Sequence, residues 1–321
     1  YARHSIRDYP RYRRMFLAGI RLIMLGRYVP NIGDTGSVGS PHLCGLTVGQ
    51  CEEGYDLFGD PILAQAAYHL VDGDLDRIEP AIADAEPGAF RAAVEKVIQI
   101  HGPLRLKSEV MTGYGLALLR DGKDERERTL WLYYGRNMGH GHADRLNLGL
   151  HAFGLDLMPD MGYPEHARVW PKREGWTHHT VSHNAVVVDR SRQKGTYSGK
   201  IDFVAITDEA QAVAVSSPDV YPQCSVYGRS SVMVRISDDN FYVADLFRAS
   251  GGNGHHYLFH SADGEITLGG MDLVPQRQGT YAGEDVGFGE FYDGEVRGYT
   301  GSGFQYLDGV RRCANPERVV W

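Results

Sequence analysis

The spacing of apolar residues in this sequence changes near Leu104, and the change limits the chain to folds in which helices precede a sheet. Before Leu104 apolar residues recur every three or four positions, which predicts helices; after it they alternate in short segments, which predicts strands. Helices followed by strands are typical of an α+β chain with separate layers. The 321 residues are about twice the usual domain length of ~150. We therefore expect a helical domain over residues 1–103 and an antiparallel β-sandwich over residues 104–321.

Three segments of the first part have helical spacing of apolar residues, at residues 11–26, 61–71 and 88–100. The second has a strong start signal, because Asp60 can cap a helix whose first residue is Pro61. Three helices do not easily close a globule, so we expect them to belong to a larger helical array. The first residues resemble the middle of a helical protein, and we expect a signal peptide and further helices to be encoded upstream.

Short alternating segments fill the second part of the chain. Turn residues such as Asp121-Gly122 and Gly251-Gly252 separate them. Glycine makes up 40 of the 321 residues, about 12%, whereas an average protein has ~7%. A high glycine content is expected of an antiparallel region with many turns. The expected strands lie within residues 111–120, 128–135, 183–189, 202–217, 230–247 and 255–261.

The charge of the chain excludes one class of partner. Its formal net charge is −8, and no block of Lys and Arg forms a basic arm. Nucleic acid is therefore not an expected partner, because binding to the phosphate backbone needs a basic face. No run of 18 apolar residues predicts a membrane span. The oligomeric state stays open, a homo-oligomer included.

The segment from residue 137 to residue 162 is rich in histidine and carboxylate groups. If its His140-Gly141-His142 motif lies on a strand, both imidazoles project from one face, which suits one metal or one reaction centre. Gly139 and Gly141 would leave room for a ligand at the backbone. The plainer interpretation is two histidines in a loop.

Asp160 and His183 support the first interpretation. Asp160 lies in turn chemistry between Pro159 and Gly162, and His183 precedes an apolar strand. Imidazole and carboxylate ligands suit zinc, and three protein ligands would leave a fourth position open. Several other histidines lie nearby, so the residues alone indicate only a histidine-rich sandwich edge that a metal could occupy.

The order of these motifs resembles that of the heparinase II/III-like polysaccharide lyases. The resemblance rests on the motif at residues 140–144, the Asp160-Met161-Gly162 turn, the T-x-x-H-N-x-V-x-V-D pattern at residues 180–189, and Gln193. It covers roughly residues 104–260 and is weaker before them. The resemblance implies an N-terminal (α/α) toroid, C-terminal antiparallel sheets and cleavage of uronate glycans such as heparin, heparan sulfate or alginate.

The resemblance also implies roles for single residues. His140 matches the family's catalytic histidine, and His142, Asp160 and His183 match its zinc ligands. The zinc is expected to organise the site and not to act as a Lewis acid.

The family's catalytic tyrosine lies upstream of this histidine. Tyr1, Tyr9 and Tyr28 are candidates, and Tyr1 has the most suitable separation from His140. The residue that neutralises the uronate carboxylate also lies upstream in the family, and no residue of this chain is assigned to it.

Four further residues are candidates for substrate binding. Arg145 could belong to a positive rim or be an ordinary solvated charge. Trp176 could stack on a sugar ring or pack at the sandwich edge. Tyr163 follows the Asp160 turn and could donate a hydrogen bond to substrate. His260 is expected on a strand beside the cleft, packed or in contact with substrate.

These expectations combine into a secreted or periplasmic polysaccharide lyase. It would cleave an anionic uronate glycan by β-elimination, through histidine and tyrosine acid–base chemistry near a structural zinc. Two alternatives remain: a zinc-dependent hydrolase that activates water at the open metal position, and an inactive carbohydrate-binding sandwich.

Overall fold

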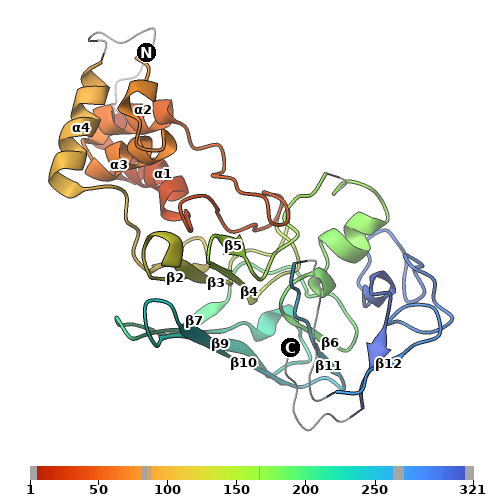
Figure 1. The fold of residues 1–321 in the computed structure, drawn as a ribbon. Helices are drawn as coiled ribbons and strands as arrows, with labels where there is room; N and C mark the ends of the chain where they lie inside the picture. The colour runs from red at the N-terminus through yellow and green to blue at the C-terminus, as the bar shows by residue number, and fades with distance from the viewer. Residues whose placement is uncertain (1–5, 81–85, 87, 166, 263–270, 315–321) are drawn as a thin grey trace. The chain divides into compact units, whose positions relative to one another are not determined.

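The structure is a computed structural model that describes residues 6–80, 86, 88–165, 167–262 and 271–314 (Figure 1). The chain divides into two compact units, which we describe separately. The helical unit comprises residues 1–29 and 41–107, and the sheet unit comprises residues 30–40 and 108–321. The segment at residues 30–40 therefore belongs to the sheet unit, although it lies within the helical part of the sequence.

The helical unit confirms the predicted start signal at Pro61. The Asp60 carboxylate accepts a hydrogen bond from the Ile62 backbone N–H at 3.3 Å. The helix that begins at Val48 was not predicted, although the sequence contains its capping box. The side chains of Thr47 and Gln50 each accept a hydrogen bond from the other residue's backbone N–H. The α-helices of the described residues are α1 Pro10–Arg21, α2 Val48–Phe58, α3 Pro61–Leu70 and α4 Ala89–His101.

These helices enclose a core of their own. Ile20 of α1, Ala64 of α3 and Val94 of α4 are fully buried and lie in one hydrophobic cluster. No helix among the residues described is long and apolar enough to cross a bilayer. Short helical turns occur in both units, at η1 Ile6–Asp8, η2 Leu75–Arg77, η3 Asp124–Arg126, η4 Arg173–Thr177, η5 Thr180–Ser182, η6 Pro218–Val220 and η7 Phe304–Tyr306.

The sheet unit contains two larger antiparallel sheets. One has the order β1-β2-β3-β4-β5 and the other the order β10-β9-β8-β7, so most neighbouring strands are consecutive in the chain. The first sheet consists of β1 Glu109–Met111, β2 Leu116–Asp121, β3 Arg128–Tyr133, β4 Asn147–Ala152 and β5 Leu155–Asp156. The second consists of β7 Lys200–Ile206, β8 Ala210–Ser216, β9 Val226–Arg235 and β10 Phe241–Ser250.

The two sheets pack face to face around one core, which confirms the predicted antiparallel sheets (Figure 1). Leu119 and Leu132 of the first sheet share a hydrophobic cluster with Val213 and Met233 of the second. In β8 and β9, buried and partly exposed residues alternate, as in a sheet with one face on a core. Two smaller ladders pair β6 Val186–Val188 with β11 His255–Tyr257, and β12 Val274–Pro275 with β13 Arg311–Arg312.

The expectation that His140 and His142 share one strand face is wrong. Residues 139–141 form a turn between β3 and β4, and Gly139 has a φ of 72°. A glycine at positive φ breaks the alternation on which that expectation rests. As a result the His140 side chain is 96% exposed, whereas His142 is fully buried.

Candidate active site and metal centre

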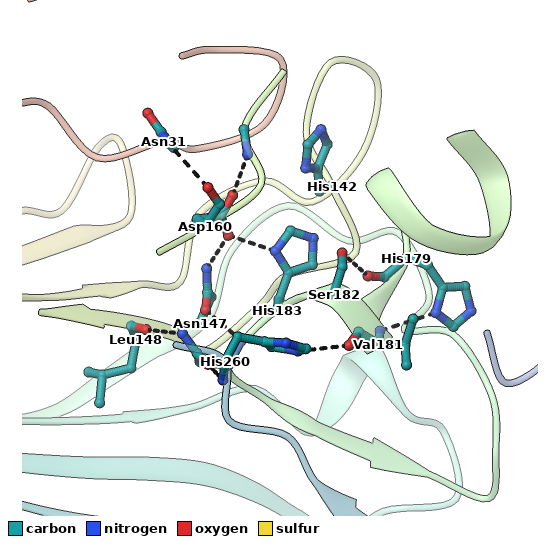
Figure 2. A network of polar contacts seen from close by, with 12 residues as sticks. Asn31, His142, Asn147, Leu148, Asp160, His179, Val181, Ser182, His183 and His260 are labelled. Atoms are coloured by element: carbon teal, nitrogen blue, oxygen red, sulfur yellow. Dashed lines mark hydrogen bonds and ion pairs between the residues drawn. The ribbon is translucent and has the colours of Figure 1, made fainter. Parts of the chain in front are cut away.

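Three of the predicted residues meet in the interior of the sheet unit. His142, Asp160 and His183 each offer a ligand atom, and these atoms lie within 4.8 Å of one another. They come from loops beside β4, β5 and β6, and all three are buried. Asp160 Oδ2 lies 2.7 Å from His183 Nδ1 (Figure 2). We call His142, Asp160 and His183 the buried triad.

Asp160 is held by several donors, as Figure 2 shows. Asn147 donates to Asp160 Oδ2 at 2.6 Å, and the Gly162 backbone N–H donates to Oδ1 at 2.8 Å. Burial alone would raise the pKa of Asp160, but His183, the neighbouring His142 and the hydrogen bond from Gly162 keep that pKa below its usual value. Burial likewise disfavours charge on His183, yet Asp160 raises the pKa of the imidazole. The contact with His183 therefore keeps Asp160 a carboxylate, and Asp160 makes the His183 imidazole more basic.

The buried triad has atoms that suit a cation. His142 Nδ1 and His183 Nε2 are buried, and neither has a hydrogen-bond partner in the described part of the chain. Buried polar atoms are normally paired, so each such atom needs an explanation. Two imidazoles and a carboxylate are a common zinc ligand set, with bonds of about 2.0–2.2 Å. The residues therefore fit the predicted zinc.

A fourth buried group, Asp144, lies near this centre. Both carboxylate oxygens are buried without a hydrogen-bond partner among residues whose structure is described. Burial raises the pKa of Asp144 to about 7, and His183 acts in the opposite direction. The interior around the triad is therefore rich in carboxylate, and a bound cation would offset that charge.

His140 lies on the solvent side of the same loop. Its Nδ1 is 2.8 Å from Asp34 Oδ2, and the rest of the ring faces solvent. Two further imidazoles lie within hydrogen-bonding distance of the other oxygen of Asp34. His178 Nε2 is 3.2 Å from Oδ1, and His142 Nε2 is 3.4 Å from it. Burial would raise the pKa of Asp34, but the hydrogen bond from His140, the neighbouring His178 and His142, and Arg173 hold that pKa below its usual value. Asp34 is therefore a carboxylate at neutral pH.

Sequence reasoning missed Asp34, which lies in the segment at residues 30–40. The Asp34 backbone N–H donates to His140 O at 2.9 Å, and the Tyr163 N–H donates to Gly36 O at 2.7 Å. Gly33 has a φ of 63°, and a Cβ there would lie 2.4 Å from His140 O. Only glycine permits this close approach. An acidic residue in a glycine-rich connection was the sole signal in the sequence.

Arg145 does not form the expected positive rim. Its side chain is fully buried, and its guanidinium donates to Ser217, Thr196 and Asn137. Arg145 comes after the buried His142 in the loop, and its guanidinium hydrogen-bonds to polar side chains in the interior of the sheet unit.

Two other arginines lie over the Tyr163 ring, and one of them also lies near Asp34. The guanidinium groups of Arg168 and Arg173 lie over the Tyr163 ring, 5.8 and 5.9 Å from its centroid. Arg173 also lies 3.7 Å from Asp34 Oδ2. Tyr163 is half-buried, and its hydroxyl accepts a hydrogen bond from Arg168. Tyr163 is thus placed beside the His140 cluster, with its hydroxyl partly occupied.

The remaining predicted residues are Trp176, His260 and Tyr1. Trp176 is half-buried and contacts the rings of His260 and Tyr306. His260 Nε2 lies 2.9 Å from Val181 O, and the His260 backbone N–H donates to Asn184, the neighbour of a triad residue (Figure 2). Both side chains have packing partners, which is the plainer of the two expectations. Tyr1 lies outside the described residues.

Comparisons with known proteins point to one family. Residues 132–287 match the family model described as Heparinase II/III-like, C-terminal. A protein named alginate lyase from Stenotrophomonas maltophilia (strain K279a) is 26% identical over 159 residues, which cover 44% of this chain and 21% of that protein.

Solved structures with the same fold carry related titles. The crystal structure of heparan sulfate lyase HepC from Pedobacter heparinus matches with a TM-score of 0.51 and 18% identity, over 74% of this chain and 32% of that one. A crystal structure of heparinase III matches with a TM-score of 0.54 and 14% identity, over 82% of this chain and 37% of that one. The chain therefore spans well under half the length of the relatives it matches, and the structural likeness shows the fold.

Proposed function

We infer that this protein is a polysaccharide lyase, because its sheet unit belongs to the heparinase II/III-like C-terminal family. The observation that carries the proposal is the contrast within one loop between the exposed His140 and the buried His142. An exposed imidazole backed by a carboxylate is suited to proton transfer. A buried set of two imidazoles and a carboxylate is suited to holding an ion.

The reaction we propose is β-elimination at a uronate residue. His140 Nε2 takes the proton from C5, the C5–H electron pair becomes the C4–C5 double bond, and the bond from C4 to O4 breaks. The departing oxygen takes a proton from an acid, for which a tyrosine is our candidate and Tyr1 the nearest match. A well-placed base or acid contributes about 10²- to 10⁴-fold in rate. Water is not consumed.

We further propose that the buried triad holds zinc. The ion would fix the orientation of His142 and His183 and offset the carboxylate charge of the interior. His142 and His183 would each supply an imidazole nitrogen and Asp160 an oxygen. This would organise the loop that carries His140.

The substrate we propose is an anionic uronate glycan. The relatives are named for alginate and heparan sulfate, which share the uronate unit and differ in sulfation. Arg168 and Arg173 would supply cations beside His140 although the chain as a whole is acidic. We also propose that the helical unit is part of a toroid, and that the protein acts outside the cytoplasm, where such polymers occur.

A screen of uronate polymers tests the proposal. The full-length protein is incubated with alginate, heparan sulfate, hyaluronan and chondroitin, and both ultraviolet absorbance and new reducing ends are followed. Elimination produces a conjugated unsaturated uronate, so we expect absorbance to rise together with reducing ends on at least one polymer. Reducing ends without absorbance would identify a hydrolase, and binding without either signal would identify an inactive sandwich; both results contradict the proposal.

A further inference from the structure

We propose that Asp34 is a positioning residue that sets the tautomers of two histidines at once, so that His140 presents a free Nε2 and His142 a free Nδ1. The proposal rests on the proposed lyase function and deepens it, because it names the group that prepares the base. It also assigns a role to the segment at residues 30–40, which precedes the family match in the chain.

The two carboxylate oxygens of Asp34 contact different histidines. Oδ2 faces His140 Nδ1 at 2.8 Å, and Oδ1 faces His178 Nε2 at 3.2 Å and His142 Nε2 at 3.4 Å. A carboxylate only accepts hydrogen bonds, so each imidazole nitrogen bonded to it must carry the hydrogen. On a neutral ring the other nitrogen then keeps its lone pair.

The consequence differs for the two rings of the loop. On His140 the lone pair is left on Nε2, and that ring is 96% exposed, so it is open to a substrate proton. On His142 the lone pair is left on Nδ1, which is buried and has no hydrogen-bond partner in the described ranges. A lone pair in that place suits a metal ion and not a polymer substrate. One carboxylate thus prepares a base on the outside and a ligand on the inside.

The position of Asp34 is fixed by backbone contacts and not by its side chain alone. Its N–H donates to His140 O at 2.9 Å, and the Asn31 side chain donates to Ser37 O at 3.0 Å within the same segment. Asn31 also reaches Asp160 O at 3.4 Å. The segment is therefore attached to both loops that carry the site, and the orientation of His140 is linked to the buried triad through Asp34 and His142.

Kinetics of Asp34 variants of the full-length protein test the role. In Asp34→Asn the amide can also donate a hydrogen bond, so the tautomer preference is lost. We expect kcat to fall about 10²- to 10³-fold while KM changes less than about threefold. Asp34→Glu keeps the carboxylate and should recover part of that loss. Asp208→Asn, at an exposed turn between β7 and β8, is the matched control and should behave as wild type.

A glycine pair tests the position without changing the carboxylate. Gly33→Ala would bring a Cβ to 2.4 Å from His140 O, whereas Gly39→Ala, at a similar φ of 64°, meets nothing within 4 Å. Both variants place alanine at a similar positive φ, so their difference reports the close approach of the Asp34 segment to the His140 loop. We expect Gly33→Ala to lose kcat as Asp34→Asn does, and Gly39→Ala to lose only stability.

Nitrogen NMR of labelled histidines provides a readout that does not depend on turnover. In wild type we expect the His140 signals, assigned by their absence in His140→Gln, to report a hydrogen on Nδ1; in Asp34→Asn they should shift towards the Nε2-protonated form. An unchanged tautomer, or a kcat within about twofold of wild type in Asp34→Asn, overturns the proposal. A parallel loss of folding and zinc would show a structural role and also overturn it. If wild type cleaves no uronate polymer, the lyase proposal fails, and the NMR result still decides the role of Asp34.

Discussion

Among the residues that the structure describes, the sheet unit contains two pairs of buried histidine and aspartate side chains that differ in their pKa shifts. In the first, His183 Nδ1 and Asp160 Oδ2 are 2.7 Å apart, the pKa of the aspartate is lowered and that of the histidine is raised. In the second, His151 Nε2 and Asp156 Oδ1 are 3.5 Å apart. There burial lowers the pKa of His151 to about 3 and raises that of Asp156 to about 7, so both groups favour their neutral forms.

The distance to the histidine and the charges nearby separate the two cases, because both carboxylates accept backbone hydrogen bonds: Asp156 from Gly39 and Met158, and Asp160 from Gly162. Asn147 and the Gly162 N–H donate directly to the carboxylate of Asp160, and the shorter contact to His183 strengthens the attraction. The closer histidine offsets the desolvation that burial imposes on the Asp160 carboxylate, whereas at Asp156 the nearby charge of Asp160 adds to it. The same two residue types therefore form a carboxylate with a more basic imidazole at Asp160 and His183, and a neutral packing pair in β4 and β5. Residue identity alone does not mark a metal site; the distance between the two groups and the charges around them do.

The exposed pair of His140 and Asp34 gives the largest expected effect. His140→Ala removes the proposed base and leaves the buried pairs untouched, so turnover should fall by about 10³-fold or more. Folding and zinc content should stay near wild type, since the side chain is 96% exposed. Ultraviolet assay, thermal unfolding and metal analysis measure the three quantities. His255→Ala, at another exposed histidine, is the control. A His140→Ala enzyme with most of its activity would remove His140 from the catalytic role.

The second test contrasts the two buried pairs directly. His183→Ala should lower zinc occupancy and thermal stability together, because an ion bound only by the folded chain stabilises it. Loss of the imidazole also leaves the buried Asp160 carboxylate without its partner at 2.7 Å, at a cost of about 3–5 kcal/mol in free energy of unfolding. Elemental analysis after dialysis and calorimetry are the measurements.

His151→Ala is the matched control for that test. It removes an equally buried imidazole from the neutral pair, so it should destabilise the fold through lost packing while zinc content is unchanged. Equal zinc content in both variants would show that His183 is not a ligand, and zinc loss in both would show that the contrast between the pairs is unimportant.

Some of these features could be predicted from the sequence alone, and others could not. The cap at Asp60 and the alternating strands follow from local chemistry, and both were predicted. The gathering of His142, Asp160 and His183 came from a resemblance, because spacing alone did not select them from the other histidines. The opposed exposures of His140 and His142 were missed, although Gly139 and Gly141 are typical of a turn and weaken a strand interpretation.

Asp34 was out of reach for a different physical reason. It lies 106 residues before His140, and its segment reaches the sheet unit through backbone hydrogen bonds, which leave no periodic pattern in the side chains. The prediction for Arg145 failed because an isolated charged residue is normally expected at the surface. A guanidinium is buried only where distant loops supply hydrogen-bond acceptors, here Ser217 and Thr196.

Arg145 therefore yields a prediction about stability and not about substrate. Arg145→Lys cannot reproduce the planar set of hydrogen bonds to Ser217, Thr196 and Asn137, so the free energy of unfolding should fall by about 2–3 kcal/mol. Denaturant unfolding measures this. KM for the polymer should stay near wild type, whereas Arg168→Ala, at the exposed side of Tyr163, should raise it. A raised KM in Arg145→Lys with unchanged stability would restore the rim interpretation.

The smallest expected change at each step of the measurement, up to about 1.4 kcal/mol per pH unit, concerns the neutral pair. Burial raises the pKa of Asp156 to about 7, above its ordinary value of 3.8, so between these values the folded chain holds a proton that the unfolded chain has released. The stability due to this proton is complete below about pH 4 and is lost as the pH rises towards about 7. Asp156→Asn mimics the protonated form, so the fall in unfolding free energy across that window should become shallower, by up to about 1.4 kcal/mol per pH unit. Denaturant titrations from acid to neutral pH measure the slope, with Asp208→Asn as the exposed control. An unchanged slope would mean that Asp156 is ionised in the fold, and the two buried pairs would then hold charge alike.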